Sequence, residues 1–167
     1  YTARFLENWS FYLPANQFTT VNAQYGPISQ DYSLLSVFPH MHLLGQTIQV
    51  YGIDPNNDTL KLIDIPHWDF EWQDFYFYKF IQKAEIGSMF YCEGTYDNTS
   101  GNLHNPNSPP ITVYPGLNTS DEMMVTFMHV MDYYTGDETY NLDSLMNQSI
   151  NDITEEDLNP VKFSVYP

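Results

Sequence analysis

Short runs in which hydrophobic and polar residues alternate recur along the chain. A period of two residues predicts strands with one buried face. Turn residues separate six such runs: Phe18–Ala23, Tyr32–Phe38, Thr47–Ile53, Leu60–Ile65, Ser88–Tyr96 and Glu122–Tyr134. Shorter strand-like pieces lie at Trp9–Leu13 and Ile111–Tyr114. Because no helical pattern alternates with these strands, the sequence predicts an all-β fold, an antiparallel β-sandwich of jelly-roll type.

The aromatic block Trp68–Phe80 has no clean period. Such a block fits a strand buried on both faces, or an aromatic wall. Its large side chains, Trp68, Trp72, Phe75 and Tyr76, could therefore line a substrate pocket or belong to the core, and we predict the core.

The composition changes after residue 135. The segment Asp137–Leu158 is acidic and poor in aromatic residues, which predicts a linker or a marginal helix with a capping box at Thr154–Asp157. The last residues, Pro160–Pro167, resemble the opening of the C-terminal sorting domain of the type IX secretion route of Bacteroidetes. We therefore predict a sandwich over residues 1–135, and an acidic linker with the start of a sorting region over residues 136–167. The resemblance implies a secreted or cell-surface protein whose type IX signal continues beyond residue 167.

Charge narrows the range of partners. The chain has 5 Lys and Arg against 21 Asp and Glu, for a net charge of −16. Nucleic acids and anionic membranes reward basic surfaces, so neither is expected as a partner. No apolar run reaches the ~20 residues of a membrane helix, so no membrane span is expected.

A single cysteine, Cys92, is present and cannot form an internal disulfide. It lies inside a predicted strand, among hydrophobic residues. Free cysteines in such positions are usually buried. We therefore predict a buried residue at Cys92 rather than a reactive thiol.

Two imidazoles stand one residue apart, at His40 and His42, within Val37–Gly45. Side chains at i and i+2 of a strand share a face, so both can reach one metal ion. Met123 offers a third ligand. Two imidazoles and a thioether suit copper, and Cu(I) in particular, better than magnesium, calcium or a structural zinc. The spacing alone also fits a pair that serves only packing or surface hydrogen bonds.

Two motifs in this order carry a family resemblance: HMHLLG at residues 40–45 and TSDEMM at residues 119–124. Together they resemble the second copper domain of the type II, ascorbate-dependent copper monooxygenases, such as peptidylglycine alpha-hydroxylating and dopamine beta-monooxygenase. The segments Ile65–Gln73, Tyr96–Asn98 and Asn105–Asn107 resemble the bacterial branch. The resemblance covers residues 30–134.

This resemblance implies one copper ion on His40, His42 and Met123, which activates oxygen and hydroxylates an aliphatic C–H bond. Ascorbate would be the electron donor, and a preceding domain with a second copper on three histidines would store an electron. The chain has no adjacent His-His pair, and its other histidines, at 67, 104 and 129, are scattered. We therefore expect part of a copper- and ascorbate-dependent enzyme that lacks full activity without its preceding domain.

The other histidines and two acidic residues have simpler interpretations. His129 lies about 20 Å along its strand from Met123, which indicates packing or a rim position. His104 lies in a loop rich in Asn and Pro, where solvent exposure is expected. Asp121 and Glu122 would hold a ligand or a loop amide rather than act as acid and base.

Some positions depart from the family pattern. The peptide-amidating relatives carry an Arg at the position of Phe38, and Asn and Tyr at those of Val125 and Phe127. These differences favour a small uncharged or apolar substrate over a peptide carboxylate. In the animal enzymes a cysteine near Cys92 bonds to one at the position of Met124, so this cross-link is not expected here. A rival hypothesis is a non-catalytic copper-binding or adhesion module, because fold does not settle function.

Overall fold

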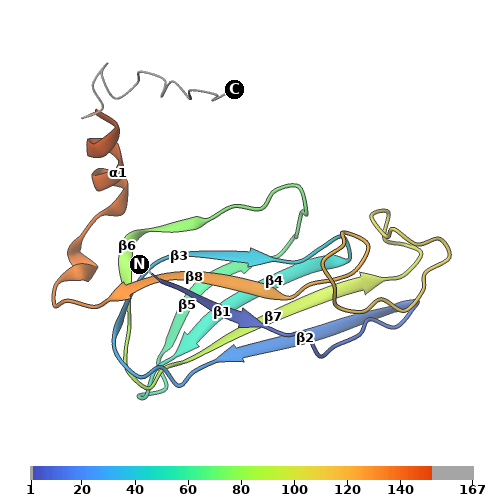
Figure 1. Cartoon of the computed structure of the whole chain (residues 1–167), viewed down its shortest axis with the longest axis horizontal. Coiled ribbons are helices and arrows are strands. Elements are labelled where there is room, and N and C mark those ends of the chain that lie inside the picture. Colours follow the sequence, from blue (N-terminus) through green and yellow to red (C-terminus); the bar gives the residue numbers. More distant parts are fainter. Residues whose placement is uncertain (1, 152–167) are drawn as a thin grey trace, which may run out of the picture.

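The computed structural model describes the backbone of residues 2–151 and the side chains of residues 3–147. Its strands form two antiparallel four-stranded sheets that face each other (Figure 1). Sheet A has the order β1 (Thr2–Glu7), β8 (Val125–Asp132), β3 (Tyr32–His40) and β6 (Tyr76–Ala84). Sheet B has the order β2 (Gln17–Tyr25), β7 (Met89–Asn98), β4 (Gly45–Ile53) and β5 (Thr59–Ile65). This interleaving of early and late strands is that of a jelly roll, so the predicted fold class is confirmed.

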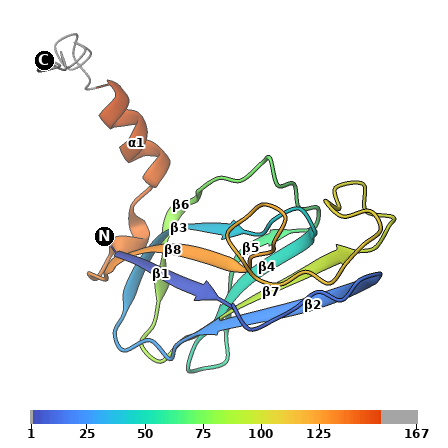
Figure 2. The ribbon, with the colours of Figure 1, turned by 45° about the vertical axis from the view of Figure 1, so that its right-hand side comes forward.

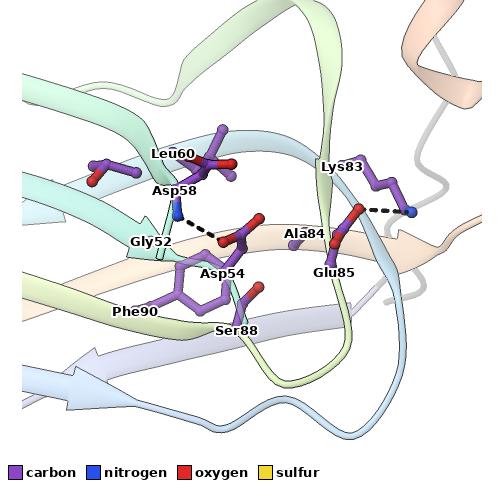
Figure 3. Close-up of a pocket in the computed structure, with 10 residues that line it drawn as sticks. Gly52, Asp54, Asp58, Leu60, Lys83, Ala84, Glu85, Ser88 and Phe90 are labelled. Atoms are coloured by element: carbon purple, nitrogen blue, oxygen red, sulfur yellow. Dashed lines mark hydrogen bonds and ion pairs between the residues drawn. The ribbon is translucent and has the colours of Figure 1, made fainter. Parts of the chain in front are cut away.

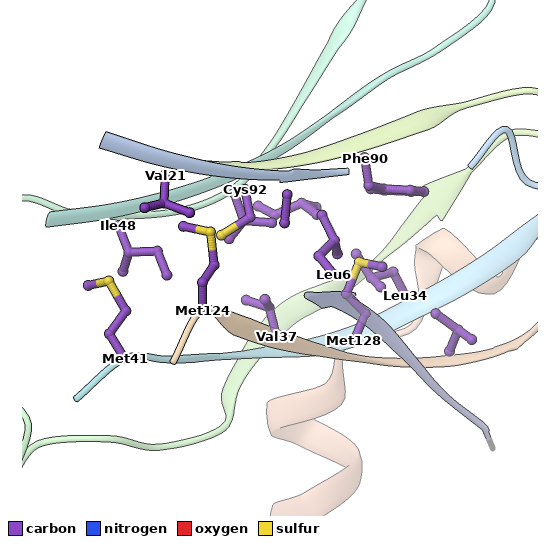
Figure 4. Close-up of a cluster of buried hydrophobic side chains, with 14 of the residues drawn as sticks. Leu6, Val21, Leu34, Val37, Met41, Ile48, Phe90, Cys92, Met124 and Met128 are labelled. Atoms are coloured by element: carbon purple, nitrogen blue, oxygen red, sulfur yellow. The ribbon is translucent and has the colours of Figure 1, made fainter. Parts of the chain in front are cut away.

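The core lies between the two sheets and takes alternate residues from each strand (Figure 4). Fully burying one such aliphatic side chain contributes roughly 1.5–3 kcal/mol. Cys92 is 1% exposed, and its Sγ lies 3.5 Å from the hydroxyl of Thr126. Burial raises the pKa of the Cys92 thiol to about 11, which keeps it protonated and unreactive. The prediction of a buried, free Cys92 is confirmed, and Met124 packs in the same core.

All six strands predicted from alternation are present, but two other strand predictions are wrong and one strand was missed. β1 was not predicted. Trp9–Leu13 and Ile111–Tyr114 are not strands and share only one bridge, between Leu13 and Val113. A side chain, rather than a ladder of backbone hydrogen bonds, connects these two segments. The buried side-chain amide of Asn98 donates to a carbonyl oxygen in each of them.

The aromatic block divides into a loop and a strand, and β6 begins only at Tyr76. Trp72 is 77% exposed and Phe75 42% exposed, while Trp68 and Tyr76 are half-buried. The prediction of core packing is therefore wrong for Trp72 and Phe75. The loop forms because aspartate side chains accept hydrogen bonds from nearby amides, which competes with strand pairing.

After β8 the chain forms a short 3-10 helix, Asp137–Thr139, and then α1, Leu142–Asn151. Figures 1 and 2 show α1 extending away from the sandwich, next to β6. The predicted capping box at Thr154–Asp157 and the sorting-like segment Pro160–Pro167 lie outside the described residues. Within residues 2–151, no helix is long and apolar enough to cross a membrane.

Candidate metal centre

The three predicted ligand residues lie at one end of the β3–β8 pair. His40, the last residue of β3, pairs with Val125, the first residue of β8. His42 follows the end of β3 by two residues, and Met123 precedes the start of β8 by two residues. His42 therefore lies just beyond the strand rather than within it, and the His40 and His42 ring centroids are 5.0 Å apart.

Burial shows which way the candidate ligands face. Met41 and Met124 are 0% exposed and point into the core (Figure 4). Their neighbours His40 and Met123 are half-buried, and His42 is 4% exposed. Because side chains alternate along a strand, His40 faces away from the core, on the outer side of sheet A.

Each imidazole has an acceptor at Nδ1. His40 Nδ1 faces Oε1 of Gln73, and His42 Nδ1 lies 3.1 Å from the carbonyl oxygen of Asp121. Gln73 is fixed in turn, because its Nε2 donates to the carbonyl oxygen of Phe70. A carbonyl oxygen can only accept, so both Nδ1 atoms carry the proton. Both Nε2 lone pairs are therefore available to a metal ion.

The environment of His40 favours the neutral ring. Burial lowers its pKa, and the adjacent His42 acts in the same direction, while the hydrogen bond to Gln73 opposes them. Neutral imidazole is the form that binds metal ions. The donor set therefore fits a soft metal ion such as Cu(I).

Glu122 connects the backbone of the two ligand segments. Its carboxylate is 0% exposed and accepts hydrogen bonds from the amides of His42 (2.9 Å), Leu44 (2.7 Å) and Met123 (3.1 Å). Burial raises the pKa of Glu122 to about 7, and the three N–H donors act against this rise. Glu122 thus has the amide-holding role expected from the sequence. The Asp121 carboxylate instead accepts from Asn118.

Two further partners hold the backbone of the candidate ligands. The indole N–H of Trp68 donates to the carbonyl oxygen of His42 (3.2 Å), and the Tyr96 hydroxyl donates to that of Met123 (2.8 Å). The sequence did not reveal these roles, nor that of Gln73. Trp68 and Gln73 do belong to the segment Ile65–Gln73 that resembles the bacterial branch, which was the available signal. Tyr96 belongs to another such segment, Tyr96–Asn98, so the same signal marked its position.

The remaining histidines have other environments. His129 hydrogen-bonds the hydroxyl of Ser36 (2.8 Å) and stacks on Phe75 at 4.8 Å, which is a packing role. His67 and His104 are exposed. Among the residues that the structure describes, no group of three or more His, Cys, Asp or Glu could hold a metal ion. Met123 therefore remains the candidate third ligand beside His40 and His42 among these residues.

Beside His40, the outer face of sheet A is aromatic. Phe38 lies 5.7 Å from Phe127 and 4.7 Å from Phe75, measured between ring centroids, and Phe127 lies 5.0 Å from Phe5. Phe38 and His40 are themselves stacked at 6.3 Å. The surface next to the candidate ligands is therefore apolar.

A cavity of about 220 Å³ lies elsewhere, beside the β4–β5 turn (Figure 3). Its polar groups already have partners: Asp54 accepts the amide of Asp58 at 2.8 Å, and Lys83 pairs with Glu85 at 3.3 Å. None of the three candidate ligands lines it. These contacts are structural, so this cavity is not a candidate functional site.

Two imidazoles and a thioether at one end of a jelly roll form a donor set that fits a copper ion. Residues 11–155 match the model of a family described as copper type II ascorbate-dependent monooxygenase, C-terminal domain. The chain therefore belongs to this copper- and ascorbate-dependent family. No curated protein matches the chain.

Proposed function

We propose that this chain is the oxygen-activating copper domain of a secreted monooxygenase that hydroxylates an aliphatic C–H bond. The observation that carries the proposal is the pair of imidazoles whose Nδ1 protons are both engaged. His40 and His42 would thus bind copper through Nε2, with Met123 as the soft third ligand.

Each part of the chain has a separate task in this proposal. When bound, copper supplies a one-electron redox couple and an open coordination position for dioxygen. Gln73 and the Asp121 carbonyl orient the imidazoles, and Glu122 fixes the spacing of the two ligand segments. The half-buried site limits the access of water to the reacting atoms.

The substrate that fits this site is small and apolar or uncharged. Phe38, Phe75 and Phe127 form the surface beside His40, and no basic residue stands among them to bind a carboxylate. A peptide with a free carboxylate would lose its hydration there without gaining an ionic partner.

Three finer features come from the sequence resemblance alone. They are membership of the bacterial branch, export by the type IX route, and a preceding domain that stores a second electron. The family description, a C-terminal domain, is consistent with a preceding domain.

Cu(I) titration against a competing chelator tests the site. The double variant His40→Ala/His42→Ala should lose at least about 100-fold in affinity, because the imidazoles supply two of three ligands. The matched control is His67→Ala/His104→Ala, which removes two exposed imidazoles and should bind as the wild type does.

X-ray absorption of the reduced protein should show a sulfur scatterer that Met123→Leu removes. Equal Cu(I) binding by both double variants would reject the site. Tight binding without ascorbate-driven hydroxylation in the chain extended by its preceding domain would instead favour a non-catalytic copper-binding module.

A further inference from the structure

Two adjacent methionines, Met123 and Met124, have opposite environments. Met124 is fully buried and points into the core (Figure 4), where it packs so closely on Gly94 that a Cβ at that glycine would lie 2.7 Å from its Cε. Met123 is half-buried, so its side chain is open to solvent. Because oxidation of a methionine requires access to its sulfur, an oxidant in solution can reach Met123 and not Met124.

The backbone of Met123 is held from both sides. Its amide donates to the carboxylate of Glu122 (3.1 Å), and its carbonyl oxygen accepts from the hydroxyl of Tyr96 (2.8 Å). Glu122 and Tyr96 are themselves fully buried. A chemical change at the sulfur of Met123 therefore leaves its backbone in place, and water can solvate a polar group at this half-buried position. Such a change should alter the candidate metal centre without unfolding the chain.

Hydrogen peroxide supplies a change of this kind. One peroxide oxygen forms a bond to the thioether sulfur, the O–O bond breaks, and the other oxygen leaves as water. Sulfur is thereby oxidised by two electrons, and the peroxide is reduced by two. The product, methionine sulfoxide, is polar, and its oxygen is a hard donor. Cu(I) prefers soft donors, so the sulfoxide would be a poor third ligand.

We propose that Met123 is a site of reversible oxidation, and that its conversion to the sulfoxide weakens Cu(I) binding by the metal-free chain. The loss of affinity rests on the proposed copper site, whereas the selective oxidation of Met123 over Met124 does not. A bound soft ion uses the sulfur lone pair and therefore protects Met123. Reduction by a methionine sulfoxide reductase restores the ligand.

Mass spectrometry after a short treatment of the metal-free chain with peroxide tests the selectivity. Met123 should be oxidised together with the exposed Met131 and Met146, while the buried Met41 and Met124 stay unmodified. Ag(I), a soft ion that does not reduce peroxide, should slow the oxidation of Met123 and leave Met131 and Met146 as reactive as before. Oxidation of Met124 at the rate of Met123, or equal slowing of all three reactive methionines, would overturn the proposal.

Cu(I) titration against a chelator, after catalase has removed the peroxide, tests the consequence. Oxidation should lower the affinity by about tenfold or more, and sulfoxide reductase should restore it. The matched control is Met131→Leu/Met146→Leu, which lacks both exposed methionines and should lose as much affinity on oxidation as the wild type. Met123→Leu should bind Cu(I) more weakly from the start and lose nothing further.

Two results of this titration have different meanings. Unchanged affinity with Met123 oxidised, or a loss that persists in Met123→Leu, would overturn the proposal and leave the imidazole pair as a copper site. Equal Cu(I) binding by the wild type and His40→Ala/His42→Ala would reject the copper site itself, and the loss of affinity proposed for the sulfoxide with it. Circular dichroism of the oxidised chain should match that of the untreated chain, since the buried methionines keep their packing.

Discussion

His40, His42 and His129 differ in the hydrogen-bond partner of Nδ1. At His40 and His42 the partner is a carbonyl oxygen, which fixes the proton on Nδ1 and leaves Nε2 available. At His129 the partner is the hydroxyl of Ser36, which can donate or accept, and the ring stacks on Phe75. Sequence spacing selected the first two correctly as neighbours. The Nδ1 partners then distinguish the candidate ligands His40 and His42 from His129, a packing residue.

Gln73 is the partner that substitution can test most directly. Gln73→Leu removes the acceptor for His40 Nδ1, so the ring loses its orientation and its preferred tautomer. We expect Cu(I) affinity to fall by about 10–100-fold. Competition with a chelator measures the change in affinity. The control is Gln24→Leu, which replaces an exposed glutamine of β2. Gln73→Glu keeps an acceptor oxygen and should retain most of the affinity. Wild-type affinity in Gln73→Leu would show that Gln73 does not orient His40.

Among the structural elements, the loop between β5 and β6 contributes most to the candidate centre. It supplies Gln73 to His40 and places Trp68 on the His42 carbonyl oxygen. Trp68 also donates its amide to the carbonyl oxygen of Gln46 at 2.8 Å, which fixes the loop against the start of β4. This loop holds the candidate ligands in position, whereas β3 and β8 set only the register of the ligand segments.

The hydrogen bond between Trp68 and the His42 carbonyl oxygen can be tested by substitution, because Gly45 packs closely against Trp68. A Cβ at Gly45 would lie 2.7 Å from Cδ1 of Trp68 and 2.8 Å from Cε of Met41. Gly45→Ala should therefore displace the indole from the His42 carbonyl. We expect it to lower the free energy of unfolding by about 1–3 kcal/mol, measured in urea. Cu(I) affinity should fall as well.

The matched control is Gly101→Ala, whose Cβ would meet only Oγ1 of Thr99, at 3.4 Å. This variant should change stability by less than about 0.5 kcal/mol. If Gly45→Ala lowered stability and left Cu(I) affinity intact, Trp68 would stabilise the fold without contributing to the metal centre.

Period-two patterns predicted most strands because they report directly which face is buried. They could not predict which side chains hold the candidate ligands in place. Gln73 meets His40 across 33 residues, and Tyr96 meets Met123 across 27. Such pairs depend on loop conformation, which periodicity does not encode. The same limit explains Trp72 and Phe75, which the sequence placed in the core and the structure places at the surface.

Over the whole molecule, the candidate copper centre lies at one end of the β3–β8 pair, and the chain carries a net charge of −16. The described residues contain one candidate copper site, and no group of three or more His, Cys, Asp or Glu among them could hold a metal ion. Hydroxylation of a C–H bond by O₂ gives alcohol and water and consumes two external electrons and two protons. One copper ion supplies one electron per oxidation. A second electron must reach the site from elsewhere.

This electron count predicts how the isolated chain will behave. With copper and ascorbate it should consume oxygen slowly and release mainly peroxide, because no second stored electron is at hand when the first has been used. A chain extended upstream to include the proposed electron-storing domain should convert most of the consumed oxygen into hydroxylated product. Oxygen uptake is measured with product and peroxide quantified together, and His40→Ala/His42→Ala gives the background from free copper. Fast, coupled hydroxylation by the isolated chain would mean that ascorbate delivers both electrons directly to this site, and that the preceding domain has another role.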